Sequence, residues 1–275
     1  MKFDPSLTRP ERVSVFLTFA GSAVILSFLV LPILAIVPLS FTHDSILSYP
    51  VEHWSLRWYR VLVNNPIWGE VLKNSLVIAL ASTLVATTLG TLAAMGLTRR
   101  HCPAPGILTA FLLTPMIVPV IITGVASYFF YTKLGLTNSF VGMILAHSIL
   151  GTPFVVLTVS ATLQGFDLNQ SRAAYSLGAR PIFAFTSVVM PQIAPGIMSG
   201  ALFAFITSFD EVIVALFIAG TEQYTLPRQM FSGIRENLDP TIAAVATVMI
   251  VVSVCILALA QFVAARGQKN GNSHG

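Results

Sequence analysis

Charged residues are scarce in this chain. Of its 275 residues, only 9% are charged and 55% are hydrophobic, whereas a soluble domain carries roughly 25% charged residues. So few charges cannot cover the surface of a water-soluble globule of this size. The composition therefore excludes an ordinary soluble enzyme and indicates an integral membrane protein.

The motifs of several enzyme classes are also missing. The sequence has no G-x-x-x-x-G-K-[ST] phosphate-binding loop and no G-x-S-x-G nucleophile elbow. Its five histidines are scattered, which predicts no metal site, and its cations form no compact basic patch for nucleic acid. We therefore expect no catalytic residue, metal or cofactor in this chain, and no disulfide between Cys102 and Cys255.

Long stretches without Asp, Glu, Lys or Arg run along the chain, and one of them contains an acidic pair. A helix needs about 20 mostly apolar residues to cross a hydrocarbon core of roughly 30 Å, and backbone groups inside a bilayer must pair with one another. We predict one all-α transmembrane domain over residues 1–275, with about six helices and a cytoplasmic loop at 164–195. The predicted spans are 14–41, 74–97, 106–131, 140–163, 197–220 and 241–264.

Six spans place both chain ends on the same side of the membrane. If that side is the cytoplasm, nine of the fifteen Lys and Arg residues are cytoplasmic, which fits the positive-inside rule. We therefore expect both termini in the cytoplasm. The nine cations are Lys2, Arg9, Arg12, Arg99, Arg100, Arg172, Arg180, Arg266 and Lys269.

The longest outer segment, 42–73, mixes aromatic residues and cations in the run from Ser55 to Arg60. Trp and Tyr favour the headgroup level of a membrane, so one interpretation is an interfacial helix that anchors the chain. The other interpretation is a docking surface for an external partner, and the two are compatible.

The cytoplasmic segment 164–195 has the pattern of two short helices joined at an elbow. Either Asp167 or Asn169 can cap the first helix. Gly178 permits a tight bend, and Pro181 suits the first position of a second helix. The segment is therefore expected to be structured.

Two further prolines, Pro191 and Pro195, are expected to limit that second helix and to separate it from the fifth span. On the first helix, Ala173, Ala174 and Leu177 fall on one face at three- and four-residue spacing. This surface of small residues suits the groove of a partner protein. The alternative is a surface loop that skims the membrane.

The same segment resembles the EAA loop, which marks the membrane subunits of binding-protein-dependent ABC importers. The resemblance rests on the runs 172–179 and 188–191 and on Pro195-Gly196. It extends over most of the chain beyond the first span. Within that family the chain is most similar to the spermidine/putrescine permeases, in the stretches 55–59, 208–212, 225–227 and 242–247.

The resemblance implies a type I ABC importer permease in a bacterial inner membrane, which moves polyamines by alternating access. It implies three kinds of partner: an ABC ATPase dimer that binds ATP and Mg, a second permease subunit, and a periplasmic solute-binding protein. It also implies that the loop is a coupling helix seated in the ATPase. The motif carries over to Ala173, Ala174, Gly178 and Pro191 and fails at Arg172, which stands where the family has a glutamate. With Arg172 and Leu177 of the same helix, these residues are the expected ATPase-coupling set.

Asp210 and Glu211 interrupt the fifth span. If residues 196–220 form a helix, Asp210 lies roughly 15 Å from its outer end, near the middle of the bilayer. A central acid costs on the order of 3 kcal/mol to insert, so the pair should face protein or water. Either the carboxylates line the translocation path and attract a cationic solute, or they pair with a group of a neighbouring subunit and fix the interface.

One histidine and several prolines also lie within the predicted spans. His147 is either a hydrogen-bonding residue between helices or an element of a proton relay. The prolines either kink the helices and shape a cavity or are simply tolerated. They are Pro32, Pro38, Pro115, Pro119 and Pro153.

Other transport functions remain open at this point. A secondary transporter driven by an ion gradient would use Asp210, Glu211 and His147 as ion ligands, although no pair of inverted repeats with matching broken spans is visible. An ion channel would need a filter loop or a charged pore ring, and neither is found. Within the ABC class, the alternative is a permease for a different solute.

Overall fold

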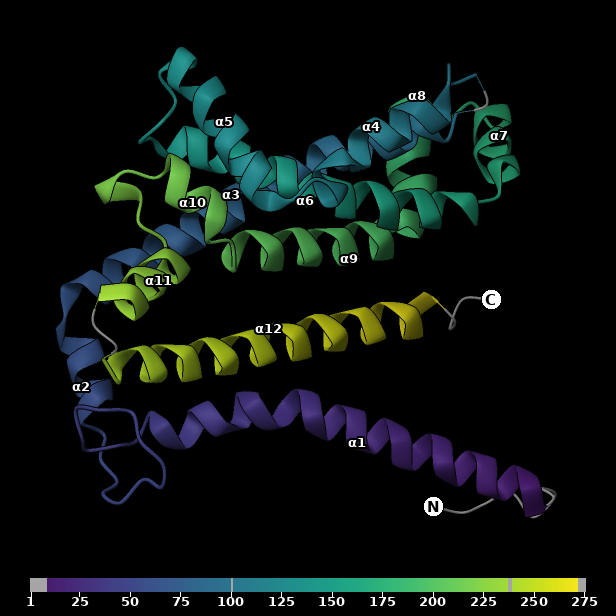
Figure 1. Cartoon of the computed structure of the whole chain (residues 1–275). Helices are drawn as coiled ribbons and strands as arrows, with labels where there is room; N and C mark the ends of the chain where they lie inside the picture. Colours follow the sequence, from purple (N-terminus) through teal and green to yellow (C-terminus); the bar gives the residue numbers. More distant parts are fainter. Residues whose placement is uncertain (1–8, 100, 237–238, 272–275) are drawn as a thin grey trace. The chain divides into compact units, whose positions relative to one another are not determined.

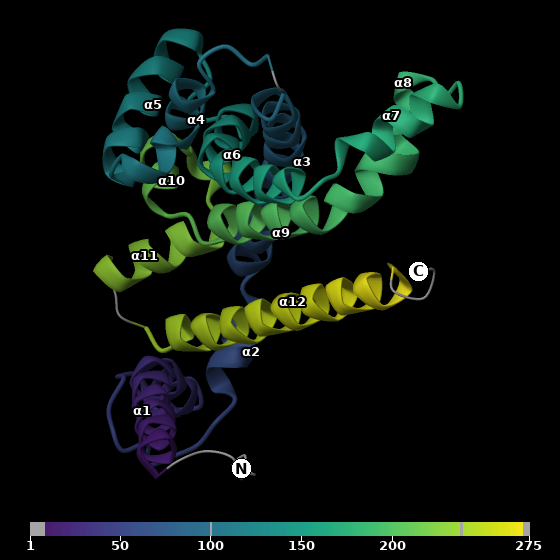
Figure 2. The same ribbon diagram turned by 90° about the vertical axis from the view of Figure 1, so that its right-hand side faces the viewer.

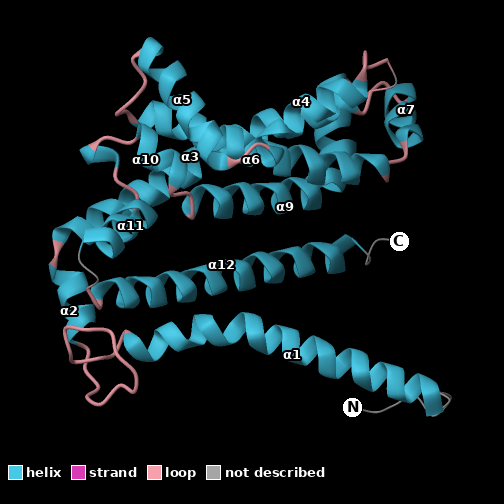
Figure 3. Ribbon diagram, viewed as in Figure 1, coloured by secondary structure: helices cyan, strands magenta, loops and turns pink. Residues whose placement is uncertain are grey.

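The computed structural model describes residues 9–99, 101–236 and 239–271, and its regular elements in these ranges are all helices (Figures 1 and 3). The predicted all-α fold is therefore confirmed. The chain divides into two compact units, Met1–Asn65 with Gly233–Cys255 and Pro66–Ser232 with Ile256–Gly275.

The first unit contains α1 (Arg9–Leu39), α2 (Arg57–Asn64) and the beginning of α12 (Thr241–Gly271). The stretch Val13–Leu39 of α1 has a mean hydropathy of 2.6, and none of its most apolar window is buried within the chain. A helix that is apolar all round and exposed all round suits contact with lipid or with another membrane subunit.

The segment between α1 and α2 folds back on itself. The His43 amide donates a hydrogen bond to the His53 carbonyl at 2.9 Å, and the Ser55 amide donates to the Phe41 carbonyl at 2.6 Å. The hydroxyls of Ser40 and Tyr59 share a hydrogen bond of 2.7 Å. These bonds fix the start of α2 beside the end of α1.

The second unit is built around three long helices, α3, α6 and α9, which lie side by side in both views (Figures 1 and 2). α4 and α10 pack against this core, and α5 packs against α10. The helices of this unit are α3 (Pro66–Leu97), α4 (Pro105–Ile117), α5 (Val120–Leu134), α6 (Phe140–Gln164), α7 (Leu168–Ser176), α8 (Pro181–Ala184), α9 (Met190–Phe209), α10 (Ile213–Ile218) and α11 (Leu226–Glu236, which continues beyond the unit).

Small residues let the three core helices approach closely, as is common in membrane bundles. A Cβ atom added at Gly151 of α6 would lie 2.9 Å from the Cβ of Ala204 on α9. A Cβ atom added at Gly200 would lie 2.8 Å from the Cα of Val155. Because Cα belongs to the backbone, the second contact cannot be relieved by a side-chain rotation.

The Gly200→Ala variant should therefore destabilise the α6–α9 contact, by about 1–3 kcal/mol as for other overpacked sites. Gly96→Ala is the matched control, because nothing lies within 4 Å of a Cβ atom at that helical glycine. The unfolding midpoint of the purified protein should fall for Gly200→Ala but not for Gly96→Ala. Equal midpoints for the two variants would contradict the close packing.

Within the described residues, four helices are long and apolar enough to cross a membrane, or five when the bent pair α4–α5 counts as one span. The described apolar part of α12, Thr241–Cys255, is shorter. Two predicted boundaries need correction. α3 begins at Pro66 rather than at residue 74, and the span predicted at 106–131 is two helices bent by 101°.

Proline explains the bend between α4 and α5. Pro119 has no backbone N–H and forces the preceding residue out of the helical region, and Val118 has an extended backbone with ψ 131°. α4 therefore ends and α5 starts in a new direction. Pro115, Pro153 and Pro32, in contrast, lie inside helices that continue.

Candidate functional site: an acidic break and a helical elbow

The span predicted at 197–220 is not one continuous helix. α9 ends at Phe209, the next three residues are not helical, and α10 begins at Ile213. The expectation that residues 196–220 form one helix that carries Asp210 and Glu211 is therefore wrong. The apolar helical run instead extends from Pro181 to Phe209, so it begins before the predicted span and ends before Asp210.

The break lies level with the middle of α3. Ser82 donates a hydrogen bond of 2.9 Å to Ser208, which stands two residues before Asp210. Ser82 lies sixteen residues after the start of α3 and fifteen before its end, which is roughly 24 and 22 Å along the helix. The acidic pair is therefore far from both ends of this membrane-length helix.

The two carboxylates have different surroundings. Glu211 is half-buried, and one of its oxygens accepts the Val214 N–H at 2.7 Å, so it holds the first turn of α10. Asp210 is exposed. Among the described residues its carboxylate has no hydrogen-bond or ion-pair partner, which leaves it available to a cation.

Arg228, on α11, binds the loop that follows α10. Its guanidinium donates a hydrogen bond of 2.5 Å to the Ala219 carbonyl and lies 4.0 Å from the centre of the Tyr224 ring. The preceding loop is held to α3 by Asn74, whose amide donates to the Glu222 carbonyl at 2.8 Å. Arg228 therefore holds the loop between α10 and α11, and it makes no ion pair with the acidic pair among the described residues.

His147 is fully buried and joins two helices. Its Nδ1 shares a hydrogen bond of 2.8 Å with the hydroxyl of Ser208 on α9. This contact confirms the interpretation of His147 as a hydrogen-bonding residue between helices. The contact between Ser82 and Ser208 has no local sequence signal, because the two serines are 126 positions apart.

The segment 164–195 forms the predicted elbow. Asp167 caps α7 by accepting the Asn169 N–H at 2.9 Å. The helix stops at Gly178, whose φ of +83° is a left-handed conformation that favours glycine. α8 then starts at Pro181. Figure 1 shows α7 at the end of α6 that lies away from α10.

The prediction that Pro191 and Pro195 limit the second helix is wrong. α8 continues through a π-helical turn at Phe185–Val189 directly into α9. In this wide turn the Met190 N–H bonds to the carbonyl of Phe185, five residues earlier. A π-turn loosens the helix just before Pro191, so the missing N–H and the bulky ring are accommodated without a break.

The elbow presents side chains to solvent. Arg172, Ala173 and Gly178 are exposed, and Leu177 is 89% exposed. Further apolar side chains are exposed beside it, namely Tyr175, Ile182 and Phe183. Pro191 is also exposed, whereas Ala174 is partly covered. An exposed apolar surface of this kind is typical of a site that a partner protein covers.

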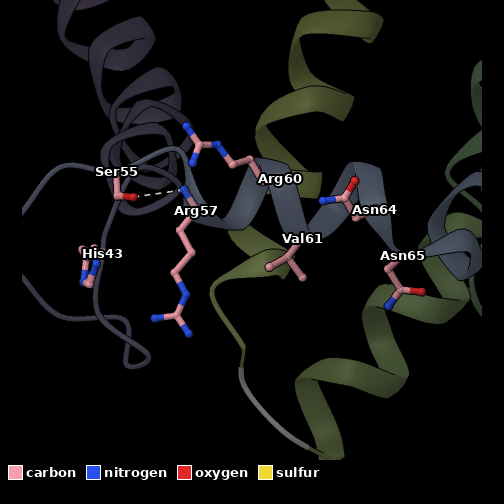
Figure 4. Close-up of a pocket in the computed structure, with 7 residues that line it drawn as sticks. All are labelled: His43, Ser55, Arg57, Arg60, Val61, Asn64 and Asn65. Carbon is pink, nitrogen blue, oxygen red and sulfur yellow. Dashed lines mark hydrogen bonds between the residues drawn. The ribbon is translucent and has the colours of Figure 1, made fainter.

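Residues 43–65 of the first unit contain an open pocket of about 580 Å³. It is lined by His43, Ser55, Arg57, Arg60, Val61, Asn64 and Asn65 (Figure 4). The Arg57 and Arg60 side chains leave α2 in opposite directions, and Arg57 lies 4.9 Å from the centre of the Trp58 ring. The two cations do not converge on one point, and Trp58 itself is buried.

Comparison with known proteins assigns the chain to a family. Residues 86–268 match the family model of the binding-protein-dependent transport system inner membrane component. The chain belongs to this family. It is a multi-pass inner-membrane permease subunit of an ABC importer, and the ion-coupled secondary transporter considered above does not fit this membership.

Individual relatives agree with this family. The chain is 31% identical to the spermidine/putrescine transport system permease protein PotC of Haemophilus influenzae, covering 90% of this chain and 96% of that protein. It is 32% identical to the putrescine transport system permease protein PotI of Escherichia coli, covering 88% and 89%.

The fold has solved counterparts as well. A bacterial ABC transporter for the acidic polysaccharide alginate aligns with a TM-score of 0.73 at 14% identity, covering 94% of this chain and 99% of that one. At this identity the likeness concerns the fold alone. It supports the type I importer permease architecture.

Proposed function

We propose that this chain is a permease subunit that moves polyamines such as spermidine and putrescine inward across the membrane by alternating access. The similarity to the PotC and PotI permeases over about 90% of the chain carries this proposal. The acidic break fits it chemically, because a polyamine bears several ammonium groups and the exposed Asp210 offers a carboxylate level with the middle of α3.

Energy for transport would come from a separate ABC ATPase dimer that binds ATP and Mg. The exposed elbow at α7 and α8 would seat in a groove of that ATPase, with Leu177 and the small residues of α7 as the contact surface. Arg172 adds a positive charge there, which would meet an acidic or neutral position of the ATPase.

The remaining partners follow from the same assignment. The exposed α1 and the acidic break suit a second permease subunit that completes the translocation path. A periplasmic solute-binding protein would deliver the polyamine at the outer face. Both termini would then be cytoplasmic, in agreement with the distribution of Lys and Arg.

A co-purification experiment tests the partner assignment. Tagged protein extracted in mild detergent should retain an ABC ATPase and a second permease, and the isolated chain should show no ATP hydrolysis. Isolation of an active transporter that consists of this chain alone would contradict the proposal.

The cargo is tested on the solute-binding protein encoded with this chain. We expect it to bind spermidine or putrescine in calorimetric titration, and to bind neutral sugars and amino acids far more weakly. Tight binding of a different solute without polyamine binding would keep the permease assignment and replace the cargo.

A further inference from the structure

A chain of hydrogen bonds joins three helices just before the acidic break. Ser82 on α3 donates to Ser208 on α9, and Ser208 shares its hydroxyl with Nδ1 of His147 on α6. All three side chains are at most 4% exposed. Ser208 is the last residue but one of α9, so these bonds hold the turn from which Asp210 emerges.

The turn of α6 that carries His147 also supports α10. Met143 and Leu150, four residues before and three after His147, belong to one buried cluster with Val214 and Ala215 of α10. His147 therefore lies on the face of α6 that is packed by the two helices on either side of the break.

Packing alone does not account for a histidine at this position. Its Nε2 is buried and has no hydrogen-bond partner among the described residues. An apolar side chain of similar size would fill the space without leaving a buried polar atom unpaired. The polar contact that the imidazole does make is the one from Nδ1 to Ser208.

We infer that His147 is a positioning residue, which acts through Ser208 to fix the end of α9 and thereby to present Asp210 to the translocation path. The inference rests on the proposed function for its link to cargo. The physical step does not depend on the cargo, because the hydrogen bond opposes unwinding or rotation of the last turn of α9.

Three substitutions at His147 distinguish a role in positioning Ser208 from a role in filling space in the core. An asparagine places a polar atom near the position of Nδ1, whereas a glutamine places one near the position of Nε2. His147→Asn should therefore retain the bond to Ser208. His147→Gln should lose it despite its larger size, and His147→Leu should lose it while filling the core.

The first readout is uptake by the assembled transporter. His147→Gln and His147→Leu should raise the KM for putrescine or spermidine about tenfold, as expected for loss of a buried hydrogen bond, with less change in Vmax. His147→Asn should remain within about twofold of the parent, which is the scatter expected for near-neutral changes. In an Asp210→Asn background, His147→Gln should cause little further increase in KM. The reason is that the histidine is inferred to affect uptake by positioning Asp210.

The second readout does not involve cargo. In a Cys102→Ser, Cys255→Ser background, an Asp210→Cys substitution is labelled with a charged, membrane-impermeant thiol reagent. His147→Gln should change the labelling rate about tenfold, corresponding to the same lost hydrogen bond, and His147→Asn should not. If polyamine is not the cargo, all uptake assays fail, including that of the parent, but this labelling pattern persists.

Equal behaviour of the asparagine and glutamine variants in the labelling assay would overturn the inference. Ser208→Ala provides the independent check, because it removes the same bond without touching the histidine. It should reproduce the change in labelling. Parent-like labelling of Asp210→Cys in the Ser208→Ala protein would overturn the inference even if the histidine variants failed to assemble.

Discussion

Replacing Asp210 with asparagine is expected to lower polyamine uptake at low substrate concentration by about tenfold or more, since a hydrogen bond to a charged group contributes about 1.5–3 kcal/mol. The carboxylate is exposed at the break and has no partner among the described residues, so its charge is available to an ammonium group. Uptake of labelled putrescine by the assembled transporter measures the effect, and the amount of assembled complex should not change.

Glu211→Gln is the matched comparison. The amide oxygen of glutamine can still accept the Val214 N–H, so the first turn of α10 should remain in place. We expect a smaller loss of uptake than for Asp210→Asn. Unchanged uptake in both amide variants would exclude a role of the acidic pair in the path and would favour its interpretation as a subunit contact.

Replacing Gly178 with glutamate is expected to uncouple ATP hydrolysis from transport. The glycine has a φ of +83°, so a residue with a Cβ is strained there by roughly 1–2 kcal/mol. No described residue has an atom within 4 Å of its added Cβ, so the bulk and charge would meet the ATPase. Hydrolysis should continue while the amount of polyamine imported per ATP falls several-fold.

Two control variants distinguish a loss of the ATPase contact at the elbow from an effect of backbone strain alone. Gly135→Glu introduces the same side chain at another left-handed glycine, with φ of +66° and open space, but at the end of α5. Gly178→Asn keeps the left-handed backbone, which asparagine tolerates. Both variants should import as much polyamine per ATP hydrolysed as the parent. A wild-type ratio of transport to hydrolysis in Gly178→Glu would show that the elbow does not form the ATPase contact.

The charge-free stretches predicted the helices well because the cost of a charge in a bilayer acts on each residue separately. α6 at Phe140–Gln164 agrees with the predicted 140–163 within one residue. The start of α3 was missed because Glu70 and Lys73 lie within its first turns. Charged residues end a membrane span, but they do not end a helix that extends beyond it.

The prolines show why the remaining geometry was not predictable from local rules. Pro119 breaks a span by 101°, whereas Pro191 is absorbed by a π-turn in a helix that continues. Both residues lack an N–H, and the difference depends on whether the surrounding packing supports a wide turn or a new direction. Neighbouring helices decide this, and one sequence does not specify them.

The candidate site was likewise predictable only where its geometry depends on neighbouring residues in the sequence. The elbow was predictable because Asp167, Gly178 and Pro181 act on the backbone within a few residues of themselves. The bond between Ser82 and Ser208 joins residues from two helices far apart in the chain. The break at Asp210 depends on those tertiary contacts and on the Glu211 cap, so the sequence predicted a continuous helix instead.

Reconstituted transport is the most direct test of the central claim. The complex of this chain with its second permease and ATPase is placed in liposomes, and uptake of labelled spermidine and putrescine is followed with the solute-binding protein present. We predict uptake that requires both ATP and the binding protein and that does not depend on an imposed ion gradient. Uptake driven by a proton or sodium gradient without ATP, or ATP-dependent uptake of another solute with none of either polyamine, would contradict the account.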